Sequence, residues 1–277
     1  MTILVTAATG KAGRHVVDQL LQRGQTVRAL TRDPAEARLP AGVEVVAGDL
    51  TVPDSLAPAV EGVEGVHLIV DGDHETLRTG PQIAELLERA GVRRVSILWN
   101  GSPGPVEEAI AARDLAWTRL EANDFMANAL AWRDEIGGDG IVREAYADVP
   151  VAIVHEADVG AVAAAVLTSD GHAGKTYVVS GPQPLSIRER VATIAAALGR
   201  EVGFEQLTDA QARARWRAAG HSEQLIELLA SWHSDPPPAA RTAVDTVERV
   251  TGRPPRTFAQ WAQEHAAAFR GRSSAVR

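Results

Sequence analysis

Short apolar runs recur along the first two thirds of the chain, separated by stretches in which apolar residues return every three or four positions. The second pattern is typical of amphipathic helices, and the first of strands covered on both faces of a sheet. Strands that alternate with helices at this spacing predict an α/β fold with a doubly wound parallel sheet and right-handed crossovers. Seven strands are expected, at Ile3–Val5, Val27–Thr31, Val43–Ala47, Val66–Val70, Val95–Leu98, Leu115–Leu120 and Thr176–Ser180.

The pattern becomes mainly helical after Gly181-Pro182-Gln183-Pro184. We therefore expect a sheet domain over residues 1–181 and a smaller, mainly helical region over 182–277 that packs on it. Capping boxes predict three helix starts in this second region. They pair Ser186 with Glu189, Thr208 with Gln211, and Thr257 with Gln260.

Two short amphipathic patterns joined by Ala219-Gly220-His221-Ser222 predict a helical hairpin that carries Trp216 and Trp232. Placed over a binding crevice, the hairpin would form a lid that excludes water. Tryptophans in such a lid would suit a large planar ligand, because their rings stack on other rings. Ordinary packing between helices is the alternative interpretation of the same pattern.

The turn after the first strand is rich in small residues, from Thr6 to Gly13. Gly10 and Gly13 lie three positions apart, and Ala7 stands where a third glycine would complete the run. A strand, a tight turn and a helix aim free backbone N–H groups at an anionic ligand. In an alternating β/α chain this arrangement predicts that the turn binds the pyrophosphate of a dinucleotide, although small residues also serve plain helix–strand packing.

Composition narrows the classes of function. The net charge is −8 and there is no basic run, so nucleic-acid binding is not expected. The chain has no cysteine, which excludes thiol catalysis, disulfides and thiolate metal sites. It shows no signal-peptide pattern and no apolar run near the ~20 residues that cross a bilayer. We expect a cytoplasmic protein without membrane contact, and the oligomeric state stays open.

With these landmarks the chain resembles the NmrA-like group of atypical short-chain dehydrogenases/reductases. The resemblance implies a Rossmann fold that binds NAD(P). Members of the group include quinone reductases, ketoreductases and redox-sensing regulators without activity. The matching stretches are Thr6–Gly13, Ala29–Pro34, Val46–Leu50, Ala90–Val95, Trp117-Thr118 through Phe125-Met126, Asp158–Val162 and Gly174–Tyr177.

The chain departs from the wider superfamily at the positions that carry its catalysis. Trp99 and Asn100 stand where a serine is expected at the end of the fifth strand. The segment 101–108 that follows contains neither tyrosine nor lysine. The chain has only two lysines and two tyrosines, Lys11, Lys175, Tyr146 and Tyr177, and none of them can form a YxxxK pair. A tyrosine–lysine proton relay is therefore excluded.

In an open α/β sheet the ligand lies outside the carboxyl ends of the strands. Arg32 ends the second strand, where a guanidinium would match the 2′-phosphate of NADP, while Asp33 could instead hold the 2′-hydroxyl of NAD. We favour NADP, because Arg32 comes first and Asp33-Pro34 is typical of a turn. The predicted cofactor-binding residues are Thr6, Ala8, Thr9, Gly10, Lys11, Ala12, Gly13, Arg32, Asp49, Leu50, Asp71, Gly72, Trp99 and Asn100.

The other site residues are expected on neighbouring loops. Asn100 and Ser102 could donate a hydrogen bond to a carbonyl oxygen, without a dedicated acid. Asp71-Gly72-Asp73-His74 is interpreted as a polar loop and not as a metal site, because hard metals need more ligands. His172 is interpreted as a turn residue. The predicted substrate contacts are His74, Asn123, Phe125, Met126, Trp216 and Trp232.

These residues and the resemblance support two functions. The first is an NADPH-dependent reductase that transfers a hydride to a ketone or quinone of an aromatic, polyketide-like substrate, as a ketoreductase of antibiotic biosynthesis would. Positioning would supply much of the rate acceleration. The second is a non-catalytic NADP(H) sensor that binds a partner protein, which the missing tyrosine and lysine favour. A sugar-nucleotide epimerase is disfavoured, because that chemistry depends on the absent tyrosine.

Overall fold

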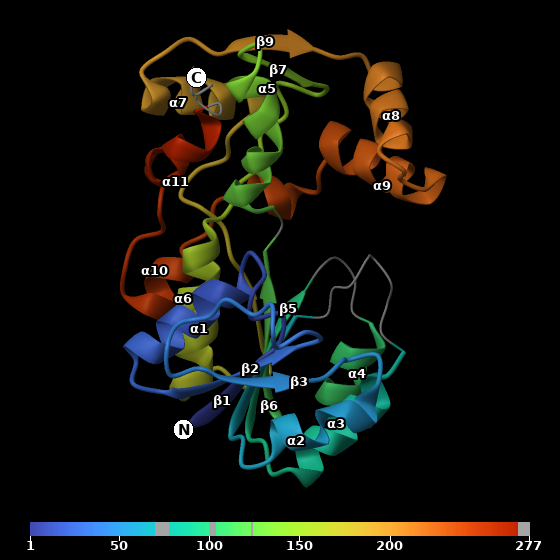
Figure 1. Ribbon diagram of the computed structural model, residues 1–277, viewed down its shortest axis with the longest axis vertical. Coiled ribbons are helices and arrows are strands. Elements are labelled where there is room, and N and C mark those ends of the chain that lie inside the picture. Colours follow the sequence, from blue (N-terminus) through green and yellow to red (C-terminus); the bar gives the residue numbers. More distant parts are fainter. Residues whose placement is uncertain (70–77, 100–103, 123, 271–277) are drawn as a thin grey trace. The chain divides into compact units, whose positions relative to one another are not determined.

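The computed structural model describes residues 1–69, 78–99, 104–122 and 124–270. Its main feature is a seven-stranded parallel sheet with the strand order β3-β2-β1-β4-β5-β6-β8 (Figure 1). The order reverses between β1 and β4, which is the switch point at which such sheets bind ligands. The predicted doubly wound parallel sheet is confirmed. Its strands are β1 Thr2–Val5, β2 Thr26–Thr31, β3 Glu44–Ala47, β4 Gly65–Ile69, β5 Arg94–Trp99, β6 Ala116–Glu121 and β8 Lys175–Val178.

Helices cover both faces of this sheet (Figure 1). On one face α1 (Gly13–Gln22) packs against α6 (Glu156–Thr168), which also contacts α10 (Thr246–Thr251). On the other face lie η1 (Pro53–Leu56), α2 (Ala57–Val60), α3 (Gly80–Arg89) and α4 (Pro105–Ala111). Helix α6 begins at Glu156, and Asp158 lies within its first turn.

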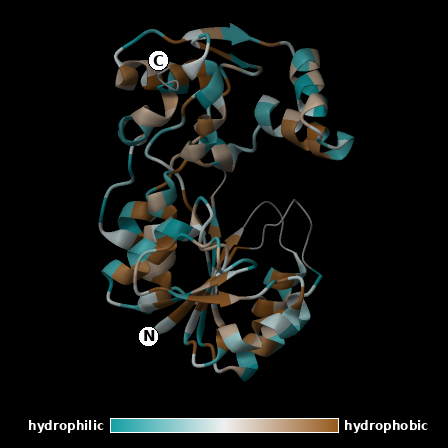
Figure 2. Cartoon of the chain, in the orientation of Figure 1, coloured by the Kyte–Doolittle hydropathy of each residue, from teal (hydrophilic) through white to brown (hydrophobic). Residues whose placement is uncertain are grey.

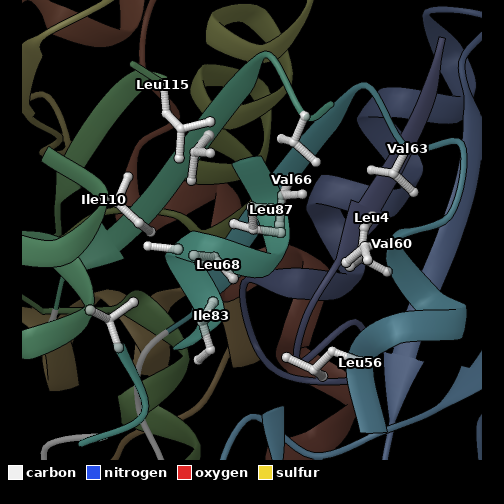
Figure 3. Close-up of a cluster of buried hydrophobic side chains, with 14 of the residues drawn as sticks. Leu4, Leu56, Val60, Val63, Val66, Leu68, Ile83, Leu87, Ile110 and Leu115 are labelled. Carbon is white, nitrogen blue, oxygen red and sulfur yellow. The ribbon is translucent and has the colours of Figure 1, made fainter. Parts of the chain in front are cut away.

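The core between the sheet and α3 explains why the strands are so apolar. Leu4, Val66 and Leu68 point to this face and meet Ile83 and Leu87 of α3 (Figure 3). Successive side chains of a strand point to opposite faces, so the intervening residues of β1 and β4 point toward α1 and α6. The strands of the sheet are correspondingly rich in hydrophobic residues (Figure 2).

The chain forms two compact units that are discontinuous in sequence. The first unit, which we call the sheet unit, comprises 1–123, 156–179 and 246–254. The second, which we call the helical unit, comprises 124–155, 180–245 and the chain from Pro255 onward. This division differs from consecutive domains over 1–181 and 182–277, because Val151 pairs with Leu185 and thereby joins segment 124–155 to the later chain.

The helical unit contains two short strands that the sequence pattern did not predict, β7 (Ile141–Glu144) and β9 (Gly203–Gln206), which pair in parallel. Its core surrounds Trp261, with Phe258 and Phe269 against it. Ser186, Thr208 and Thr257 cap their helices as predicted. The helices are η2 Met126–Trp132, α5 Arg133–Gly137, α7 Ile187–Leu198, α8 Asp209–Ala218, α9 Glu223–Ser234, η3 Pro238–Arg241, α11 Phe258–His265 and η4 Ala266–Phe269.

No helix in the described part of the chain is both long and apolar enough to span a membrane.

Candidate functional site

The turn between β1 and α1 is a tight loop built around one carbonyl group. Ala7 adopts a left-handed conformation with φ 46°, and its carbonyl oxygen accepts a hydrogen bond from the Gly10 N–H at 2.9 Å. A Cβ atom on Gly13 would lie 2.1 Å from the same oxygen. Gly13 is therefore required where the chain enters α1. Ala7 stands where a third glycine would complete the run. Glycine would adopt its left-handed conformation at a lower cost in free energy.

The Arg14 side chain stabilises this turn by hydrogen bonds to two of the carbonyl groups of the turn. Its Nε atom donates to the Gly10 carbonyl oxygen at 3.1 Å, and its Nη2 atom donates to the Thr9 carbonyl oxygen at 3.3 Å. The first N–H groups of a helix have no partner within the helix and carry its positive dipole end. The Arg14 side chain thus links the carbonyl groups of the turn to the first turn of α1. We did not predict this role, although a basic residue four positions after Gly10 is the signal for it.

Thr6 supports the turn from below. Its buried hydroxyl donates to the His67 carbonyl oxygen at 3.2 Å and accepts the Ile69 N–H at 2.8 Å. The side chain thus joins the carboxyl end of β1 to that of β4, directly at the switch point. Any contact that Thr6 makes with a dinucleotide would therefore use its backbone. Ala8 and Ala12 are also buried, while Thr9 and Lys11 are exposed.

A second buried polar pair lies deeper in the same sheet. His67 of β4 and Ser96 of β5 are both fully buried, and the His67 Nδ1 atom lies 2.6 Å from the Ser96 hydroxyl oxygen. Burial lowers the pKa of His67 to about 3. The imidazole is therefore neutral at pH 7 and serves as a hydrogen-bonding group between neighbouring strands. The sequence pattern gave no sign of this pair.

The ends of β2 and β3 carry the residues predicted to contact the adenosine. Arg32 is exposed and makes no ion pair or hydrogen bond within the described residues. The Asp33 carboxylate accepts the Ala35 N–H at 3.0 Å, which confirms the turn predicted at Asp33-Pro34. Thr31 pairs with Ala47, so that Arg32 and Asp49 follow neighbouring strand ends.

Asp49 is a turn carboxylate that also feels the charge of Arg32. Its Oδ1 atom accepts hydrogen bonds from the N–H and the hydroxyl of Thr51, each at 2.8 Å. These bonds lower the pKa of Asp49, and the nearby Arg32 guanidinium lowers it further. The carbonyl oxygen of Leu50 accepts the Thr79 hydroxyl at 2.7 Å, and its side chain packs on the core. Hydrogen bonds therefore hold both Asp49 and Leu50 in place, and Asp49 lies near Arg32.

Several predicted site residues lie outside the described residues. They are Asp71, Gly72, His74, Asn100, Ser102 and Asn123. Trp99 is the last residue of β5 and so stands at the carboxyl edge of the sheet. The catalytic assignment to Asn100 and Ser102 stays a prediction.

His172 is a turn residue, as predicted. It lies between α6 and β8, at the amino ends of the strands and therefore at the edge opposite the predicted ligand site. Its Nδ1 atom lies 2.9 Å from the Tyr177 hydroxyl oxygen and its Nε2 atom 3.2 Å from the Ser169 hydroxyl oxygen. The histidine and Tyr177 together fix this turn.

The predicted substrate contacts that the structure describes belong to the helical unit. Met126 is buried in the core of that unit. Phe125, Trp216 and Trp232 are partly exposed and therefore remain accessible to a ligand. Trp216 lies on α8 and Trp232 on α9, which pack side by side as the predicted helical hairpin (Figure 1). Its action as a lid stays a prediction.

Both tyrosine hydroxyl groups are held by other side chains. The Tyr146 hydroxyl donates to the Asp209 carboxylate, and burial together with this carboxylate raises the pKa of Tyr146 to about 12. Tyr177 lies in the sheet unit, in β8, with its hydroxyl against His172.

Comparison with known proteins places the fold and the turn in a family. The model of the NmrA-like family matches residues 1–114, which contain the turn, Arg32 and Asp49. A (4-alkanoyl-5-oxo-2,5-dihydrofuran-3-yl)methyl phosphate reductase of Streptomyces griseus is 36% identical over 96% of this chain and 99% of its own. The chain belongs to the NmrA-like family. This confirms the resemblance drawn from the sequence.

Other relatives cover the chain equally well. An NAD(P)H azoreductase of Xenophilus azovorans is 34% identical over 96% of this chain and 99% of its own. The solved structure of an NADPH-dependent quinone oxidoreductase from Escherichia coli, complexed with NADPH, covers 95% of this chain and 99% of its own. Its TM-score is 0.80 at 24% identity, a likeness that shows the shared fold.

Proposed function

We propose that this NmrA-like protein is an NAD(P)H-dependent reductase that uses NADPH and delivers a hydride to a conjugated ketone or quinone. Two relatives that exceed 30% identity over 96% of this chain are named as reductases, of a furanone phosphate and of azo compounds. Their acceptors are electron-poor and conjugated, as quinones and aryl ketones are. A ketone of an aromatic, polyketide-like molecule belongs to the same chemical class.

The exposed guanidinium of Arg32, which makes no ion pair or hydrogen bond among the described residues, is the observation that favours NADPH. A guanidinium binds a phosphate by two parallel hydrogen bonds, whereas a ribose hydroxyl calls for a carboxylate. The carboxylate that follows Arg32 already caps its own turn, so it does not offer both oxygens to a ribose. Arg32 directly follows the carboxyl end of β2, where the adenosine ribose of a dinucleotide lies in such folds, which supports a 2′-phosphate there.

The turn fits the pyrophosphate of the same coenzyme. Gly13 leaves the space that a Cβ atom would take beside the Ala7 carbonyl group, and α1 begins without a side-chain cap, so that its positive dipole end suits an anion. When bound, NADPH supplies the hydride. The chain itself binds and orients the coenzyme through the turn and Arg32, and Thr6 fixes the two strand ends between which the ligand lies.

No tyrosine is proposed as the proton donor of the reaction. General acid catalysis contributes typically about 10²–10⁴-fold, so a site that works mainly by positioning can still turn over. Asn100 and Ser102 are the proposed hydrogen-bond donors to the developing oxygen anion. Replacing either one singly should therefore leave measurable activity.

Coenzyme titration of an Arg32→Ala variant tests the proposal. We expect the Kd for NADPH to rise about 10- to 100-fold, because a hydrogen-bonded charge pair contributes about 1.5–3 kcal/mol. The Kd for NADH should stay unchanged, because NADH has no 2′-phosphate. The matched control is Arg93→Ala, which removes an exposed arginine at the amino edge of the sheet. Equal losses for both coenzymes, or none, would contradict the assignment.

A panel of quinones and aryl ketones tests the reductase activity itself. We expect NADPH oxidation to depend on the added acceptor. Binding of NADPH and NADP⁺ without turnover of any acceptor would instead support the NADP(H) sensor.

A further inference from the structure

Three aromatic rings of the helical unit form a cluster that the proposed function has not used. They belong to Tyr146 in the loop after β7, Trp216 on α8 and His233 on α9. The Tyr146 and His233 rings are 6.5 Å apart at an interplanar angle of 4°, and the Trp216 and His233 rings are 6.0 Å apart at 24°. We call these three residues the aromatic cluster.

The His233 ring does not lie in direct face-to-face contact with the Tyr146 ring or the Trp216 ring. Stacked carbon atoms approach to roughly 3.5–4 Å. The centroid separations of 6.5 and 6.0 Å exceed this distance, so that the rings do not fully cover one another. All three residues are partly exposed. The cluster consequently presents uncovered ring surface to a ligand.

A network of charged side chains holds the cluster in place. The Tyr146 hydroxyl donates to Asp209 at the start of α8. The Arg213 Nε atom donates to Asp209 at 2.9 Å, and its Nη1 atom donates to Glu227 of α9 at 2.6 Å. The network thus joins all three elements that carry the rings. It also keeps Tyr146 in a left-handed conformation with φ 53°, which costs a non-glycine residue about 1–3 kcal/mol.

His233 brings hydrogen-bonding groups to the cluster. Neither of its ring nitrogens makes a hydrogen bond within the described residues. Burial lowers the pKa of His233, Asp124 opposes this shift and Arg190 adds to it. The ring is therefore neutral at pH 7 and offers one N–H donor and one acceptor.

The charges around the cluster are balanced or slightly negative. Arg190 is paired with Asp124, at 3.2 Å between the Nη1 and Oδ2 atoms, and its Nε and Nη2 atoms donate to the Leu185 carbonyl oxygen. Arg213 is shared between Asp209 and Glu227. Neither guanidinium is left over for an anion. The surroundings therefore favour a neutral ligand over a phosphate or carboxylate.

We propose that the aromatic cluster is a binding site for a neutral, planar, conjugated carbonyl compound of the quinone type. The ligand ring lies against the uncovered surface of Trp216 and Tyr146, and its carbonyl oxygen accepts a hydrogen bond from His233. The proposal rests on the proposed function, since it names the class of acceptor that the reductase takes. His233 binds the acceptor and is not assigned a proton-transfer step.

Calorimetric titration of 1,4-naphthoquinone into the full-length protein saturated with NADP⁺ tests this site without turnover. We expect His233→Phe, which keeps a ring but removes both nitrogens, to raise the Kd about 3- to 10-fold, the value of one neutral hydrogen bond. His233→Gln should recover part of the affinity. Trp216→Ala should raise the Kd more than 10-fold. The matched control is His221→Phe, the same substitution at an exposed position of the same hairpin.

The outcomes separate the site from simple helix packing and from the proposed function. An unchanged naphthoquinone Kd in both His233 variants and in Trp216→Ala would overturn the proposal, whatever their melting temperatures. So would tighter binding of 1-naphthyl phosphate than of naphthoquinone, because it would mean that the site prefers an anion. Absence of naphthoquinone binding to a wild-type protein that binds NADPH would overturn the site alone. Absence of NADPH binding would instead remove the proposed function.

Discussion

Ala7 shows how a single residue can carry a strained conformation for the sake of a ligand site. Its φ of 46° belongs to a region in which a non-glycine residue costs about 1–3 kcal/mol. This conformation orients the Ala7 carbonyl group, which lies close to Gly13 and accepts a hydrogen bond from the Gly10 N–H. The backbone of the turn is thus fixed before a coenzyme arrives, which reduces the ordering cost of binding.

Gly13→Ala should disrupt this turn more than Gly10→Ala. The added Cβ atom would lie 2.1 Å from the Ala7 carbonyl oxygen in the first case and 3.1 Å in the second. We expect Gly13→Ala to raise the NADPH Kd more than 10-fold, with a loss of stability of about 1–3 kcal/mol from overpacking. Gly10→Ala should change the Kd by less than that. The measurement is a fluorescence titration with NADPH beside a urea unfolding curve, and equal effects of the two variants would contradict the geometry.

Among single residues, the sequence was sufficient to predict those whose role is set by the local backbone conformation. The glycines of the turn and the Asp33-Pro34 turn could be located from local pattern alone. Arg14 and the pair of His67 with Ser96 could not, because their roles depend on which carbonyl group or strand lies beside them in space. The cluster of Tyr146 and His233 likewise joins residues far apart in the chain.

Among the elements, α6 approaches its neighbour α1 closely. It is apolar nearly all round its surface, as expected for a helix packed on several sides. A Cβ atom on Gly160 would lie 2.6 Å from the His15 carbonyl carbon of α1. The glycine therefore sets the distance between the two helices that cover this face of the sheet.

Gly160→Val should separate α1 from α6. We expect a loss of unfolding free energy of about 1–3 kcal/mol or more, since the obstacle is backbone and cannot rotate away. Because α1 follows the turn directly, the NADPH Kd should rise as well. The matched control is Ala161→Val, at the next and partly exposed position of α6. Thermal unfolding of the two variants measures the difference, and similar melting temperatures would show that the helices can move apart without cost.

Helices proved easier to predict than the second, smaller sheet. Capping residues such as Ser186 and Thr208 mark a helix start within four positions. The strands β7 and β9 have only four residues each and pair across some sixty positions of sequence, so no local pattern reveals them. The same long-range pairing, at Val151 with Leu185, makes both compact units discontinuous.

For the molecule as a whole, the buried His67 should make stability depend on acid. Folding lowers its pKa from 6.5 to about 3, so the unfolded chain takes up a proton at a higher pH than the folded one. Stability from this group is fully present above about pH 6.5 and is lost as the pH falls toward about 3. A difference of about 3.5 pKa units, at 1.36 kcal/mol each, corresponds to a loss of about 4–5 kcal/mol.

His67→Gln separates this contribution from that of every other group. The amide can still form a hydrogen bond with Ser96 but does not titrate. Between about pH 6 and pH 4 the unfolding free energy of the wild type should therefore fall more steeply than that of the variant, by up to about 1.4 kcal/mol per pH unit. Urea unfolding at a series of pH values measures both slopes. Because His172 and His233 also have lowered pKa values and are present in both proteins, only the difference between the slopes reports on His67. Parallel slopes would mean that the imidazole can be protonated inside the sheet, and that β4 and β5 open there at little cost.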